Sequence, residues 1–265
     1  MNSTTVRTLL VRGMLAGIGA GLLASVVAYF IGIPSVDAAI DYESAQAASA
    51  AGGHAHDAEE ELFSRAQQST VGLATGVLVF ATALGGIAAL AYCFALGRVG
   101  RFRARATAAL VAGAGFVTVS LVPFLKYPAN PPATSDPGSL DQRTTLYFLM
   151  IALSVLLGVG AILLGRRLAA RLGDWNASVA AGAAFVAVVA VAMAFLPSVS
   201  ETPKDFPATV LWEFRLAALG IQAVLWAAFG LLFGHLAERV LEPRAVATPV
   251  SGAAVGGPVA TGVSE

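Results

Sequence analysis

Six long apolar stretches constrain this chain more than any other feature of its sequence. A helix needs about 20 mostly apolar residues to cross the roughly 30 Å hydrocarbon core of a bilayer. None of the six contains a lysine or an aspartate, and none contains an arginine near its middle. They are Leu9–Ile33, Ser69–Leu96, Ala106–Leu125, Thr145–Gly165, Ala177–Leu196 and Leu211–His235. The sequence therefore predicts an all-α integral membrane protein with six transmembrane helices in residues 1–242.

Charge is sparse and lies between the apolar stretches. Charged residues make up 12% of the chain, against roughly 25% in soluble domains. The net charge is zero, so the chain offers no basic field for nucleic acid. Its single cysteine, Cys93, excludes an intrachain disulfide and a cysteine-ligated metal site, and we expect it to be packing filler. No nucleotide-binding loop, zinc-protease motif or nucleophile elbow is present, so we predict no enzyme and no permanently bound cofactor.

The positively charged residues orient the predicted helices. Cytoplasmic loops of membrane proteins carry an excess of lysine and arginine. With the N-terminus inside, eleven of the sixteen basic residues lie on the cytoplasmic side. These are Arg7, Arg12, Arg98, Arg101, Arg103, Arg105, Arg166, Arg167, Arg171, Arg239 and Arg244. We therefore predict that both termini are cytoplasmic, and that residues 243–265, which are aperiodic, form a disordered cytoplasmic tail.

The first apolar stretch could instead be a cleaved signal peptide. It is longer than the usual 7–15 residue apolar region of such a peptide. It also carries Gly13, Gly17 and Gly21 at four-residue spacing, a pattern typical of closely packed helices in lipid. These features favour a retained transmembrane helix.

The six predicted helices group into three hairpins joined on the outer side. Each odd-numbered helix ends near a proline, the first of them at Pro34. Each even-numbered helix opens with an arginine: Arg65, Arg143 or Arg215.

Residues at near-helical spacing from these arginines form one small or polar face on each even-numbered helix. In a membrane, such faces turn toward other helices or a water-filled path. The candidate path residues are Arg65, Ser69, Arg143, Tyr147, Met150, Ser154, Glu213, Arg215 and Gln222. Snorkelling arginines and tight packing would explain the same pattern.

Residues 34–68 form the longest predicted outer loop, and this loop is acidic. It contains two imidazoles beside several carboxylates, donor types that suit Co²⁺, Ni²⁺ or Zn²⁺. The candidate metal-capture residues are His54, His56, Asp57, Glu59 and Glu60. The alternative is a solvated, alanine-rich acidic loop without a bound metal.

Three segments of the chain resemble the CbtA family of predicted cobalt transporter subunits. The first runs from Ser120 to Pro132 and continues at Arg143-Thr144-Thr145-Leu146-Tyr147-Phe148. The second joins Pro203-Lys204-Asp205-Phe206-Pro207-Ala208 to Leu211-Trp212-Glu213-Phe214-Arg215-Leu216. The third is Asp41-Tyr42-Glu43. The resemblance covers about residues 5–240. It implies a location in the bacterial inner membrane and a small one-helix partner with a histidine-rich tail, CbtB. It brings no metal-ligand set.

Residues and resemblance together favour a membrane subunit for uptake of a divalent transition-metal ion, with Co²⁺ as the transported species. The arginines at the three helix openings would repel a bare cation unless nearby acids neutralise them. Two other hypotheses therefore stay open. One is transport of an anionic solute or a metal chelate, and the other is a non-transporting scaffold for a partner protein.

Overall fold

The computed structural model describes residues 2–50, 68–100, 102–131, 134, 138–199, 202–203 and 205–242. Within these ranges every regular element is a helix, which confirms the all-α prediction. Five of these helices are long and apolar enough to cross a membrane. They are Ser3–Gln46, Thr70–Ala95, Ala104–Lys126, Leu140–Phe195 and Ala208–Leu241.

The first helix continues beyond the proline at which the sequence predicts its end. Helix α1 (Ser3–Val27) passes through a π-helical turn, η1 (Ala28–Gly32), into α2 (Ile33–Ala50). Pro34 is the second residue of α2, directly after the π-turn, and it has no N–H to donate to the preceding turn. The π-turn changes the hydrogen-bond spacing just before the proline. The predicted loop at 34–68 therefore begins as helix, and its residues 51–67 lie outside the described part of the chain.

The same arrangement recurs at the next proline. Helix α5 (Ala104–Gly115) passes through the π-turn η3 (Phe116–Leu121) into the short α6 (Val122–Lys126). Pro123 is again the second residue after the π-turn. The helix ends at Tyr127, whose backbone leaves the helical conformation. Here the predicted end near a proline agrees with the structure.

Small residues bring α1 close to α4 (Leu73–Ala95), which follows the π-turn η2 (Gln68–Gly72). A Cβ added at Gly17 would collide with the carbonyl oxygen of Ala81. A Cβ added at Gly85 would collide with the carbonyl oxygen of Gly13. The four-residue spacing of small residues in the first helix therefore serves close backbone packing, as the sequence predicts.

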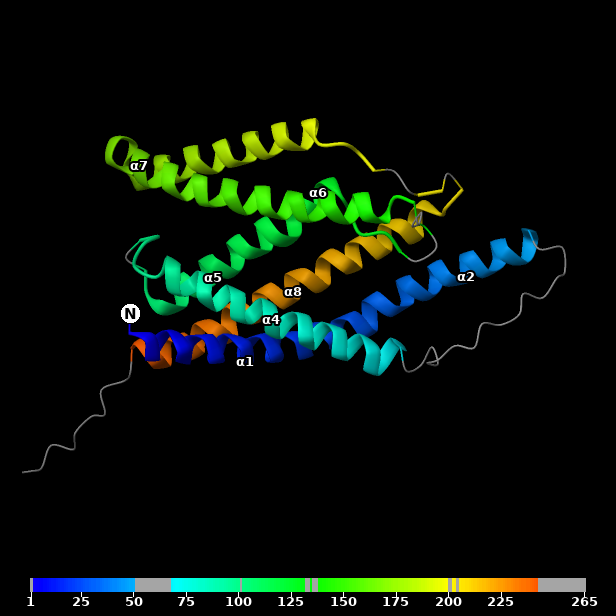
Figure 1. Cartoon of the computed structure of the whole chain (residues 1–265), viewed down its shortest axis with the longest axis horizontal. Helices are drawn as coiled ribbons and strands as arrows, with labels where there is room; N and C mark the ends of the chain where they lie inside the picture. Colours follow the sequence, from blue (N-terminus) through cyan, green and yellow to red (C-terminus); the bar gives the residue numbers. More distant parts are fainter. Residues whose placement is uncertain are drawn as a thin grey trace, which may run out of the picture.

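Helix α7 (Leu140–Phe195) folds back on itself at one glycine. A straight helix of 56 residues would be about 84 Å long. Gly173 breaks it with φ 74° and ψ 163°, a conformation that favours glycine. The two arms then lie side by side (Figure 1). The sequence predicts a connection of about ten residues between these arms, whereas the helix runs through most of it.

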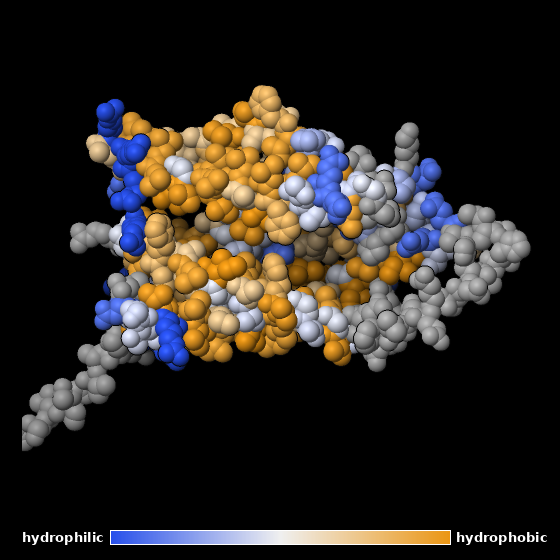
Figure 2. Space-filling model, viewed as in Figure 1, coloured by the Kyte–Doolittle hydropathy of each residue, from blue (hydrophilic) through white to orange (hydrophobic). Residues whose placement is uncertain are grey.

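The helices form two layers. Helices α1, α4, α5 and α8 (Ala208–Leu241) pack together, and their shared core centres on Tyr92, Trp226, Phe229 and Phe233. Helix α7 lies on the other side of the η3–α6 segment, which it contacts directly (Figure 1). Figure 2 shows a broad hydrophobic surface across the middle of both layers, as expected of side chains that face lipid.

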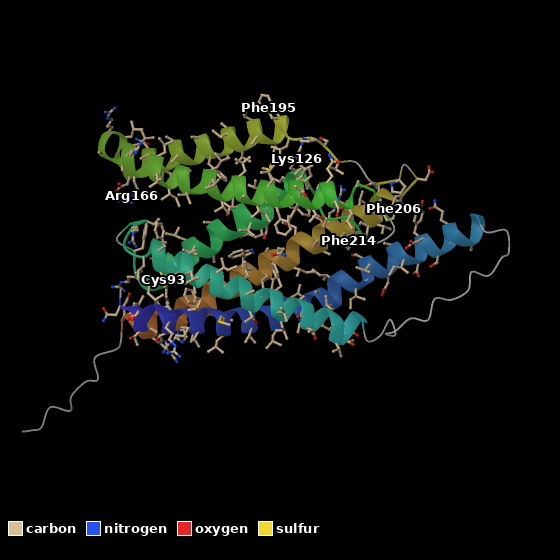
Figure 3. All side chains as sticks on the ribbon, in the orientation of Figure 1. Cys93, Lys126, Arg166, Phe195, Phe206 and Phe214 are labelled. Atoms are coloured by element: carbon tan, nitrogen blue, oxygen red, sulfur yellow. The ribbon has the colours of Figure 1, made fainter. Side chains whose placement is uncertain are left out.

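Hydrophilic residues lie at both ends of the molecule (Figure 2). One end, here called the arginine-rich end, carries the N-terminus and the turn of α7; Arg166 and Cys93 lie toward it (Figure 3). There Arg105 forms an ion pair with Glu238 at 2.5 Å. The opposite end, here called the proline-rich end, carries Lys126 and Phe206 (Figure 3).

Candidate functional site

Two adjoining cavities lie between η3–α6, α7 and α8, toward the proline-rich end. The larger has a volume of about 340 Å³ and the smaller about 80 Å³, and both are lined by Tyr127 and Arg143. In Figure 2 a recess separates the α7 layer from the remaining helices, with hydrophilic atoms among hydrophobic ones. The other residues that line the larger cavity are Ser120, Phe124, Ala129, Leu140, Thr144, Tyr147, Ala218, Leu219 and Gln222. Those of the smaller cavity are Pro128, Asn130, Val199, Thr202 and Arg215.

Two arginines from different helices meet at the outer part of this site. Arg143 lies in the first turn of α7 and donates to the carbonyl of Pro128 at 2.6 Å. Arg215 lies about two turns into α8 and donates to Ala129 O at 3.3 Å and to Asn130 Oδ1 at 3.0 Å. Both guanidinium groups therefore hold the same short segment, which follows α6.

Tyr127 anchors the start of that segment. Its hydroxyl donates to the carbonyl of Pro197, at the end of α7, at 2.9 Å. The side chain is buried, which raises the pKa of the phenol, so Tyr127 stays protonated at neutral pH. The segment is thus tied to both ends of α7 and to α8.

A polar network closes the inner end of the larger cavity. The indole N–H of Trp226 donates to Ser120 Oγ at 3.0 Å, and Ser120 Oγ donates to Gln222 Oε1 at 3.3 Å. Ser120 reaches α8 because it lies on the π-turn η3. π-Turns frequently occur at functional sites, where they redirect side chains. Buried polar groups in lipid need such partners, and here α5–η3 supplies one to α8.

The structure brings together four of the predicted path residues. Arg143, Tyr147 and Gln222 line the larger cavity, and Arg143 and Arg215 line the smaller one. Met150 and Ser154, on the same predicted face as Tyr147, are fully buried below it, and Ser154 Oγ donates to the carbonyl of Thr118.

Other predicted residues lie elsewhere or outside the described part of the chain. Glu213 is exposed and does not line either cavity. Ser69 belongs to η2. Arg65 and the whole capture set fall within residues 51–67, beyond the described ranges. These are His54, His56, Asp57, Glu59 and Glu60.

Ser120 and Tyr127 are among the lining residues that helical spacing did not predict. They lie on the third predicted helix and at its end, whereas the predicted polar faces belong to the even-numbered helices. The sequence feature that points to both residues is the run from Ser120 to Pro132, which carries the resemblance to CbtA. Tyr42 and Phe206 lie in the two other segments that resemble CbtA, and these two residues are in contact. Their ring centroids are 5.0 Å apart, and the Tyr42 hydroxyl donates to the carbonyl oxygen of Asp205 at 2.9 Å.

The described residues contain no group of three or more His, Cys, Asp or Glu side chains that could hold a metal ion. The site is instead rich in hydrogen-bond donors.

A protein-family model matches residues 6–238, almost the whole helical part of the chain. Its description is "Probable cobalt transporter subunit (CbtA)". The chain belongs to the CbtA family. The resemblance found in the sequence is thereby confirmed. No curated protein and no solved structure that was compared matches the chain.

Membership assigns this CbtA protein to the cobalt transporter subunits, a class for which no catalytic role is indicated. As a subunit it has partners, whose identity the family name leaves open. Its five long apolar helices characterise a multi-pass membrane protein.

Proposed function

We propose that this CbtA protein is the membrane-embedded subunit of a cobalt uptake system, and that the cavity between η3–α6, α7 and α8 forms part of the substrate's route. One observation carries the proposal. Polar side chains from three helices converge on a cavity in a protein whose surface is broadly hydrophobic across its middle. In a membrane protein, polar groups on helix faces are unfavourable unless they serve packing or a hydrophilic path.

The proposed topology has six crossings. The arms of α7 on either side of Gly173 are each long enough to span, so the five helices would cross the bilayer six times. The excess of arginines at the turn of α7 and at the N-terminus favours a cytoplasmic arginine-rich end. Both termini would then be cytoplasmic, and the cavity would lie toward the outer side of the inner membrane.

Metal capture is assigned to the outer segment with His54 and His56. Imidazoles beside carboxylates would raise the local cobalt concentration on the outer side of the membrane. A small one-helix partner with a histidine-rich tail, of the CbtB type, would complete the system.

Cobalt accumulation in cells tests this function. Cells that express the chain should accumulate more cobalt from limiting medium than cells that lack it, and nickel and zinc measured alongside give the selectivity. The Gln222→Leu variant, which removes the polar end of the cavity, should lower accumulation at unchanged protein abundance.

Gln142→Leu is the matched control. Gln142 lies in the first turn of α7, is exposed, and does not line the cavity, so its replacement should leave accumulation unchanged. Equal cobalt content with and without the chain would reject the proposed function. Normal accumulation by Gln222→Leu would remove the cavity from the route.

A further inference from the structure

We propose that the cavity is an oxyanion site, and that cobalt passes it as a complex with a small polycarboxylate rather than as a free hydrated cation. This inference rests on the proposed function and names the form of its substrate. Four observations carry it: the orientation of Gln222, the donors of Arg215, the charge of the lining, and the size of the cavities.

The hydrogen-bond network fixes which atom Gln222 presents to the cavity. An indole N–H can only donate, so Ser120 Oγ accepts from Trp226. The Ser120 hydroxyl donates its own proton to Gln222 Oε1 at 3.3 Å. The amide oxygen therefore points to Ser120, and the Nε2 group with its two donors faces the cavity that Gln222 lines.

Arg215 presents further donors to the adjoining cavity. Its Nε and one Nη each bond to a loop oxygen, at 3.3 Å and 3.0 Å. Three of its five N–H donors therefore have no bond to any residue in the described ranges. Within the same ranges no carboxylate forms an ion pair with Arg215. A planar guanidinium with such donors matches a carboxylate, which accepts two parallel hydrogen bonds.

The charge of the lining disfavours a bare cation. Arg143 and Arg215 both line the smaller cavity, and no Asp, Glu, His or Cys is among the described residues that line either cavity. The positive charge of Arg215, in a site surrounded by apolar helices, repels Co²⁺ more strongly than it would in bulk water. A complex whose carboxylates outweigh the charge of the metal is attracted by the same charge.

The two volumes suit one ligand with a protruding carboxylate. A water molecule occupies about 30 Å³ of liquid. The smaller cavity, about 80 Å³, therefore has room for one carboxylate beside Arg215. The larger cavity, about 340 Å³, has room for the body of a small chelate, with Gln222 at its inner end.

Calorimetric titration of the purified full-length chain in detergent tests the site. The probes are citrate alone, cobalt chloride alone, and the two mixed one to one. Citrate and cobalt citrate should bind. Arg215→Lys keeps the positive charge but loses the planar guanidinium with its paired N–H donors. It should weaken the binding of citrate and of cobalt citrate at least about tenfold. Gln222→Glu places a carboxylate where a donor was, and should weaken both by a similar factor.

Two control variants separate this effect from a general change of charge or fold. Arg239→Lys makes the same exchange at the exposed, opposite end of α8. Gln142→Glu adds the same carboxylate at an exposed position of α7. Both should bind citrate as the wild type does. No citrate binding by the wild type, or equal affinity in Arg215→Lys and Arg239→Lys, would overturn the proposal. Tighter binding of inorganic phosphate than of citrate would overturn the carboxylate assignment.

Cobalt uptake into cells distinguishes this inference from the function on which it rests. Added citrate should sustain chain-dependent uptake at concentrations that leave little free Co²⁺. If citrate abolishes uptake that proceeds in its absence, the chain transports cobalt but the proposed form of the substrate is wrong. If citrate binds in the calorimeter but no chain-dependent uptake occurs in either medium, the oxyanion site stands and cobalt transport fails.

Discussion

Trp226 donates its indole N–H to the hydroxyl of Ser120 at 3.0 Å, and this bond joins the middle of α8 to the π-turn η3. Trp226 is 4% exposed and Ser120 6%, so the bond lies in the interior of the protein. The bond also determines the orientation of Gln222, and thereby the chemistry of the cavity's inner end.

Replacing Ser120 with alanine should therefore destabilise the protein. The change leaves a buried N–H without an acceptor, which costs about 1–3 kcal/mol. The melting temperature of the purified protein in detergent should fall. Ser178→Ala is the control, because Ser178 is exposed and bonds only within its own helix turn, to Asp174 O. Equal melting temperatures for the two variants would show that the network contributes nothing to stability.

Close packing of α1 against α4 predicts a strong effect at one glycine. Gly85→Ala places a methyl group against the backbone of Gly13, and overpacking of this kind costs about 1–3 kcal/mol. Gly76→Ala, in the same helix but with open space around it, should be neutral or slightly stabilising. Thermal unfolding of both variants checks this. The packing account is wrong if Gly76→Ala is the more damaging change.

Reporter fusions test the proposed six crossings. Fusions on the cytoplasmic side should be active with a cytoplasmic reporter; these follow Arg103, Arg171 and Arg244. Fusions on the outer side should be active with a periplasmic reporter; these follow His54, Asp136 and Lys204. The fusion at Arg171 is the most informative, because it lies beside the break at Gly173. A reversal at any one position contradicts the topology.

The outer histidines should affect capture more than transport. Replacing His54 and His56 together with alanine should lower cobalt uptake at limiting cobalt and leave the maximal rate nearly unchanged. The measurement is the initial uptake rate over a range of cobalt concentrations. Unchanged uptake at the lowest concentration would identify the segment as a solvated acidic loop.

Apolar length was enough to predict the helices but not their exact ends. The first predicted helix stopped at Pro34 because a proline usually interrupts a helix. The π-turn η1, which precedes it, has no local sequence signature, and it lets the helix run on to Ala50. The connection predicted between Gly165 and Ala177 contains the turn at Gly173, but the helix runs on to that turn because the arginines and alanines before it are good helix formers.

Helical spacing grouped Arg143 with Tyr147 and Arg215 with Gln222, and all four line the two cavities, since period alone decides which side of a helix a residue occupies. Glu213, a candidate because of its charge near the membrane boundary, is about 200° around the helix from Arg215 and does not line either cavity. Spacing also gives no account of which helices are neighbours. The contribution of Ser120 depends on α5–η3 packing against α8, a contact between residues about a hundred positions apart.

Thiol modification of the cavity during cobalt uptake tests the central claim most directly. In a Cys93→Ala background, Ala218→Cys places a thiol in the lining of the cavity, while Leu216→Cys places one on the exposed side of the same helix. A charged methanethiosulfonate should stop cobalt uptake by the Ala218→Cys variant and leave uptake by the Leu216→Cys variant intact. Full labelling of Ala218→Cys with undiminished cobalt uptake would contradict the claim that the substrate passes through this cavity.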